Sequence, residues 1–299
     1  MTMKNRDYWK LRDELDKALE NGLLLKISML VDKGYMDTEN EIYAFYGRYA
    51  TNNKLSYQEA NRLLTPEELR ECAQRIKRLK RYLNSYDKNP FDESIKQHIE
   101  REIRLLQGRT RTTRLQALYD SINEKWIDIA IQVDRETGKL LRETYSREYN
   151  ESSKKQTSIK LIEAAILIPI FGRHFSDNIW KHKDNTVAFV NAEFNRSLVM
   201  NRDVRNTIKI IHRQRPATYH QLERLIRTEN CTARTAGTLD GYKDSDVKYV
   251  QVVVLDDEMT CPDCSSEADR IIPLNEVSIG VNAPPYHPNC RCSIIPVIK

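Results

Sequence analysis

The chain has 299 residues, enough to bury a large core and to hold two domains. Charged residues make up 30% of it and the mean hydropathy is −0.65, so we expect a soluble protein with a largely polar surface. The longest apolar stretch, residues 164–171, is far shorter than the roughly 20 residues of a membrane-spanning helix, so we expect no membrane partner. Pro169 interrupts this stretch, and we interpret it as a helix end or a loop docked on a core.

Charge is distributed unevenly along the sequence. Residues 250–299 contain seven acidic and three basic side chains, a net charge of −4. Because the whole chain carries +5, residues 1–249 carry +9. A basic body of this kind suggests contact with nucleic acid or with an acidic protein surface.

The first part of the chain is predicted to be helical. Apolar side chains at three- and four-residue steps indicate a helix over residues 7–31, interrupted at Gly22. Thr65 and Glu68 form a predicted capping box with Pro66 at the first helical position, so another helix starts there.

Two further helices are predicted from the same periodicity. One covers about residues 92–107, and the other begins near residue 114 and continues beyond residue 133. Their spacing suits antiparallel helical hairpins or a long coiled arm. The chain has only 9 glycines and 10 prolines, which also favours helices over loop-rich β folds.

Basic side chains occupy the polar faces and the connections of these helices. We predict that they bind double-stranded DNA weakly and without sequence specificity; the alternative is an ordinary solvated helix surface. The candidate residues are Arg75, Arg78, Arg81, Arg109, Arg111 and Arg114.

The polar segment 151–158 is a predicted linker between two domains. Residues 1–150 would form a helical N-terminal domain, and residues 151–299 a smaller α+β domain. Within the second domain, Thr218 and Gln221 suggest another capping box at the start of a helix.

Cysteine and histidine cluster near the C-terminus. Cys261 and Cys264 form a C-x-x-C turn, and His287, Cys290 and Cys292 follow as a second short cluster. A predicted strand at 249–255 precedes the first cluster and another at 293–298 follows the second. This order predicts a metal-stapled module over residues 249–299, which completes an α+β fold class.

Mixed sulfur and imidazole ligands suit zinc, and we predict one structural Zn²⁺. Five candidates compete for four positions. Cys261, Cys264 and Cys290 make the simplest set of three, and either His287 or Cys292 would be the fourth ligand. The alternatives are reduced cysteines without metal, or disulfides.

Three blocks of sequence carry a resemblance to a known family. They are LERLIRTE at residues 222–229, LDDEMTCPDC at 255–264 and PPYHPNCRC at 284–292. In this order they resemble the C-terminal domain of Mu-F-like phage minor head proteins, also called head morphogenesis proteins. The resemblance covers roughly residues 175–299. The family usually has a glycine soon after the second cysteine, and this sequence has none there.

The resemblance implies a minor capsid protein in the interior of a virion head, present in the bacterial host cytoplasm during assembly. Such a protein would associate with the phage portal and with the procapsid, its scaffold or its major capsid protein, and would assist DNA packaging or ejection. Arg227, Thr228 and Glu229 belong to the first block. We interpret them as a structural motif whose polar contacts orient the cysteine loop.

An enzyme is the main alternative to a virion protein. It would be an effector delivered with the phage genome, either an ADP-ribosyltransferase-like protein or a zinc-dependent hydrolase with Asp257 or Glu258 as its base. A free-standing DNA-binding regulator is a third possibility. The sequence contains no complete catalytic motif, so we expect no enzymatic activity and name no catalytic residue.

Overall fold

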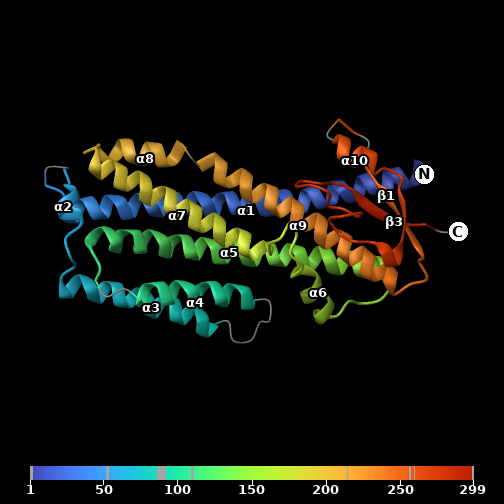
Figure 1. The fold of residues 1–299 in the computed structure, drawn as a ribbon, viewed down its shortest axis with the longest axis horizontal. Helices are drawn as coiled ribbons and strands as arrows, with labels where there is room; N and C mark the ends of the chain where they lie inside the picture. The colour runs from blue at the N-terminus through green and yellow to red at the C-terminus, as the bar shows by residue number, and fades with distance from the viewer. Residues whose placement is uncertain are drawn as a thin grey trace. The chain divides into compact units, whose positions relative to one another are not determined.

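The computed structural model describes residues 3–51, 54–85, 92–108, 111–213, 215–255, 257–258 and 260–297. Helices form most of the structure, and a small antiparallel sheet lies near the C-terminus, which confirms the α+β class (Figure 1). No described helix has both the length and the apolar character that crossing a membrane requires.

The chain divides into two compact units, each assembled from separate segments. Unit 1 contains Met1–Lys26, Glu136–Asn178 and Gln221–Lys299. Unit 2 contains Ile27–Arg135 and Ile179–His220. The predicted linker at 151–158 lies within the segments of unit 1. A division into separable domains at residue 150 therefore stays a prediction that proteolysis has to test.

The described residues of unit 2 form helices joined by turns and by isolated β-bridges. Three long helices contribute part of their length to it: the later part of α1 (Met3–Tyr49), the earlier part of α5 (Arg114–Ser153) and most of α7 (Phe175–Val199). Four helices belong to it entirely: α2 (Tyr57–Ala60), α3 (Pro66–Ser85), α4 (Glu93–Gln107) and α8 (Val204–Arg213). The predicted capping box is confirmed at the start of α3. The Thr65 N–H donates to Glu68 Oε2 at 2.7 Å, and the Glu68 N–H donates to Thr65 Oγ1 at 3.3 Å.

Two predicted helix boundaries are wrong. α1 continues through Gly22, because a glycine costs a helix only about 1 kcal/mol and the neighbouring Leu23 and Leu24 are buried. α9 (Arg215–Lys243) begins before Thr218, since Pro216 is tolerated in the first turn of a helix.

Unit 1 is built around the close approach of α5 and α9. A Cβ atom added to Gly237 of α9 would lie 2.5 Å from the Tyr145 carbonyl oxygen of α5. One added to Gly241 would lie 2.5 Å from Cβ of Ser152. Only glycine allows the two backbones to come so near, so these positions fix how the helices pack.

The sheet of unit 1 has the order β2-β1-β3, with both pairs antiparallel. The strands are β1 (Tyr249–Val253), β2 (Ile271–Pro273) and β3 (Ser293–Pro296), and the short helices η2 (Leu274–Glu276) and α10 (Pro262–Ser266) lie in the connections. Val250 pairs with Ile272, and Val252 pairs with Ile294. These four side chains are buried together with Leu239 of α9, so the sheet packs on the C-terminal part of that helix.

Candidate metal centre

The first two candidate ligands are positioned by the start of α10. Cys261 is the N-cap residue of this helix, and Pro262 occupies its first turn. The N–H of Cys264 donates to the Cys261 sulfur at 3.4 Å, as expected for a C-x-x-C turn. This contact lowers the pKa of the Cys261 thiol and so favours the thiolate that binds metals.

The second cluster comes from the loop that leads into β3. Its His287 imidazole Nε2 lies 3.1 Å from Cys261 Sγ and 3.0 Å from Cys264 Sγ. The Nδ1 atom of the same ring lies 2.7 Å from the carbonyl oxygen of Pro288, which fits an Nδ1–H donor. That hydrogen bond leaves Nε2 as the free lone pair directed at the two sulfurs.

The donors form two groups of three that share Cys264. In one group Cys264 lies with Cys261 and His287, and in the other with Cys290 and Cys292. The Cys264 and Cys290 sulfurs are 3.8 Å apart. A tetrahedral zinc with Zn–S bonds of about 2.3 Å separates its sulfur ligands by about the same distance, so the donor set fits this ion.

The neighbouring thiols favour ionisation of Cys290. Hydrogen bonds from Cys231 and then from Cys292 lower the pKa of the Cys290 thiol. The same hydrogen bond between Cys292 and Cys290 raises the pKa of the Cys292 thiol. Burial raises the pKa of Cys264 to about 12, and a bound dication would favour its ionisation. All five predicted donors thus lie together, with Cys264 common to both groups.

Two residues of α9 that the sequence did not single out hold the cysteine loop in place. Cys231 is buried, and its thiol lies 3.8 Å from the carbonyl oxygen of Cys292. Arg234 Nη2 donates to the same carbonyl at 2.9 Å. Thr228, Cys231 and Arg234 are three residues apart and so share one face of a helix. This spacing is the sequence signal from which Cys231 and Arg234 could have been predicted.

Thr228 and Arg227 of the predicted motif at residues 227–229 make separate polar contacts, and Glu229 is buried. Thr228 Oγ1 accepts the backbone N–H of Asn289 at 3.1 Å, so this residue does orient the cysteine loop. Arg227 pairs with Glu223 at 3.0 Å. Glu229 is buried, and burial raises the pKa of its carboxyl to about 8.

A pocket of about 360 Å³ lies beside the candidate ligands in unit 1. His287 and Cys290 contribute to its lining, as do charged residues of α1 and α9. Buried Arg234 pairs there with Asp16 at 2.7 Å, and half-buried Glu20 accepts from Asn230 at 2.8 Å. The pocket therefore contains paired charges next to the sulfur cluster.

Asp257, a candidate base of the alternative hydrolase, pairs with Arg291 instead. Its carboxylate accepts two hydrogen bonds from the guanidinium, at 2.8 and 2.5 Å. Arg291 lies between Cys290 and Cys292, so this bidentate pair connects the turn after β1 to the cysteine loop.

The comparisons with known proteins bear on this region of the chain. The family described as Phage Mu protein F like protein matches residues 190–295, which contain every candidate ligand. We call residues 190–295, which are similar to this family, the Mu F-like domain. This match confirms the resemblance to phage head morphogenesis proteins, and no curated protein and no solved structure matches the chain. Cys231 and Arg234 also belong to the Mu F-like domain.

The candidate DNA-binding arginines lie outside the Mu F-like domain, and several are engaged in ion pairs within unit 2. Arg75 and Arg78 both donate to Glu124, at 3.1 Å from Arg75 Nε and 2.6 Å from Arg78 Nε. Arg81 and Arg111 are exposed. Arg109 lies outside the described residues.

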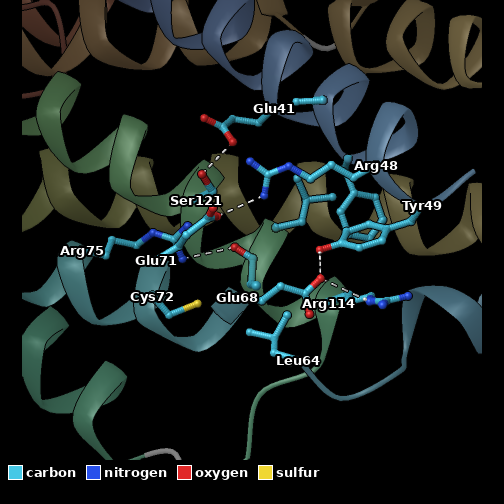
Figure 2. A pocket seen from close by; sticks show the side chains of 14 residues that line it. Glu41, Arg48, Tyr49, Leu64, Glu68, Glu71, Cys72, Arg75, Arg114 and Ser121 are labelled. Carbon is cyan, nitrogen blue, oxygen red and sulfur yellow. Dashed lines mark hydrogen bonds and ion pairs between the residues drawn. The ribbon is translucent and has the colours of Figure 1, made fainter. Parts of the chain in front are cut away.

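Arg114 lines a polar pocket of about 240 Å³ in unit 2. Figure 2 shows Tyr49, Glu68 and Arg114 directed toward one another. The Tyr49 hydroxyl donates to Glu68 at 2.6 Å, and the Arg114 guanidinium lies 4.3 Å from the centre of the Tyr49 ring. Arg114 also pairs with Glu59, so its charge is balanced by two carboxylates within the unit.

Proposed function

We propose that this chain is a minor component of a phage head, located in the head interior and present in the host cytoplasm while heads assemble. The observation that carries the proposal is the Mu F-like domain, whose residues include the whole cysteine and histidine cluster. The partners would be the portal protein and the procapsid, through its scaffold or major capsid protein.

The experiment is to purify procapsids and virions from a phage that encodes this chain, and to measure its copies by quantitative mass spectrometry. We expect a few copies per particle, recovered with the portal after mild disruption of the head. A phage lacking the gene should assemble heads that package or deliver DNA poorly. Equal composition and equal infectivity with and without the gene would contradict the proposal.

We further propose that the centre holds one structural Zn²⁺ and that the domain is not catalytic. Cys261, Cys264, His287 and Cys290 would be the ligands, since two sulfurs lie near the free Nε2 of His287 and a third lies 3.8 Å from Cys264. Four protein ligands close a tetrahedral site and leave no position for a substrate or an activated water. Cys292 would remain a buried thiol beside the centre.

Weak contact with double-stranded DNA is the least specific part of the proposal. The charge of +9 over residues 1–249 supports it, and the exposed Arg81 and Arg111 are the residues best placed to contribute. Arg75, Arg78 and Arg114 already form ion pairs within unit 2, so their charges are less available to bind phosphate groups. Such binding would be electrostatic and would weaken steeply as the salt concentration rises.

A further inference from the structure

The segment from Lys154 to Arg173 in unit 1 exposes apolar side chains that the proposed function does not use. It contains α6 (Ile159–Ile166) and the turn that follows it. Ile159 is 61% exposed, Leu167 54% and Phe171 57%. Leu161 and Ile168 are exposed as well. The sequence suggested a helix end or a docked loop here; α6 does end at Ile166, but much of the apolar stretch faces solvent.

The opposite side of this segment fixes it to unit 1. Ala165, Ile166 and Ile170 are buried. An isolated bridge pairs Ile170 with Arg173, and Phe171 and Gly172 between them adopt positive φ values of 51° and 84°. This tight turn directs Phe171 outward while Ile170 points inward. The segment is therefore a structured projection, and a helix with apolar side chains on both sides needs a second apolar partner.

Basic side chains precede, interrupt and follow the exposed apolar side chains along the sequence. Lys154, Lys155, Lys160 and Arg173 are all exposed. Glu163 is the one acidic residue between positions 154 and 173, and it is half-buried. We call the exposed part of residues 154–173 the α6 surface. Its net positive charge and its exposed apolar side chains together fit a partner with a negatively charged surface and an apolar interior.

We infer that the α6 surface binds the surface of an anionic lipid bilayer. Ile, Leu and Phe would enter the boundary between headgroups and acyl chains, while the lysines and Arg173 contact lipid phosphates. Protein interfaces are depleted in Lys, whereas three of the four exposed cations of the α6 surface are lysines, so the charged residues favour lipid over protein. This contact needs no membrane-spanning helix, but it departs from the expectation of no membrane partner, which considered only spanning helices. It does not depend on the proposed head function.

The test is flotation of the purified full-length protein with vesicles. One preparation contains equal amounts of phosphatidylcholine and phosphatidylglycerol, and the other phosphatidylcholine alone. We expect binding to the anionic vesicles that is much weaker on neutral ones and falls with added salt. Lys160→Gln and Arg173→Gln should each weaken binding about fivefold. Ile168→Ser combined with Phe171→Ser should abolish it.

Matched controls keep the result specific to the α6 surface. Val281→Ser removes a 74%-exposed apolar side chain elsewhere in unit 1, and Lys139→Gln removes an exposed charge of α5; both should bind like the original chain. Circular dichroism should show unchanged thermal unfolding for every variant used. Failure to float with anionic vesicles, or equal effects of the control variants, would overturn the inference. The inference would also be overturned if a phage head protein bound the α6 surface and prevented flotation with vesicles.

Discussion

Arg234 and Asp16 form a buried ion pair at 2.7 Å that connects α9 with α1 inside unit 1. The same guanidinium donates to the carbonyl oxygens of Arg291 and Cys292, the two residues that follow the candidate ligand Cys290. One buried side chain therefore ties the N-terminal helix to the cysteine loop. A buried cation is tolerated at such a position only when its hydrogen bonds are satisfied.

Replacing Arg234 should affect both stability and metal binding. Arg234→Met leaves Asp16 with one basic partner fewer and frees two loop carbonyls, so we expect the free energy of unfolding to fall by about 3 kcal/mol. Zinc affinity should fall about 10- to 100-fold, because the residue positions the ligand loop. Urea unfolding and competition with a chelator measure the two effects. The control Arg270→Met removes an exposed pair and should change neither; an unchanged zinc affinity in Arg234→Met would contradict this role.

Gly237 should not accept a side chain. In Gly237→Ala the new methyl group would meet the Tyr145 carbonyl at 2.5 Å, which forces α5 and α9 apart and should cost about 1–3 kcal/mol. Gly22→Ala is the matched control in another helix interior, where no atom lies within 4 Å, and it should stabilise the protein by up to about 1 kcal/mol. Urea unfolding of both variants measures the contrast. Equal effects would mean that the helices do not approach as closely as described.

Glu229 should make stability depend on pH. Its pKa is raised to about 8 in the folded protein and is about 4.3 in an unfolded chain. Between these values the folded state holds the proton and the unfolded state does not. The contribution of this group therefore falls as the pH rises toward 8, by up to about 1.4 kcal/mol per pH unit. Above pH 8 it should be constant.

The measurement is urea unfolding at several pH values from 6 to 9. Glu229→Gln should have a flatter profile than the original chain, since its amide does not titrate. Glu223→Gln, on the same helix, should retain the original slope. If Glu229→Gln follows the original profile throughout, the buried carboxyl is not the group that responds.

The basic residues of unit 2 should divide into two classes. Arg81→Glu combined with Arg111→Glu changes exposed side chains, so we expect weaker DNA binding, a salt slope reduced by about 2 and unchanged stability. Arg78→Glu places a second carboxylate beside Glu124 and should lower the free energy of unfolding by about 1 kcal/mol. Filter binding across salt concentrations and thermal unfolding distinguish these classes. DNA binding that is insensitive to the double change would argue against this surface.

Local signals predicted much of the fold and the sulfur donors. The capping box at Thr65 depends on residues three apart, and the C-x-x-C turn depends on the same short spacing, so both could be read from the sequence. Contacts between distant segments could not. Arg78 meets Glu124 46 positions later, and Arg234 meets Asp16 218 positions earlier, pairings that only the packing of the helices creates.

The apolar stretch around Phe171 shows the same limit. Composition identified it as apolar and too short to span a membrane, but it could not tell which side chains face inward. The turn at Phe171 and Gly172 decides that, by burying Ile170 and exposing its neighbour. The backbone conformation of Phe171 and Gly172 thus places part of this apolar stretch on the surface of unit 1, where the sequence had suggested a loop docked on a core.

The cysteine and histidine cluster is the centre of this account, and the metal content of the purified chain tests it most directly. Protein produced with zinc available should contain about one zinc per chain by elemental analysis, and Cys264→Ser should lose it because Cys264 belongs to both donor groups. Cys72→Ser, in α3, should retain it. Chelation should unfold the sheet and the cysteine loop, because structural zinc sites contribute on the order of 10–16 kcal/mol. A metal-free chain that keeps the same fold would contradict the claim that a structural zinc stabilises this domain.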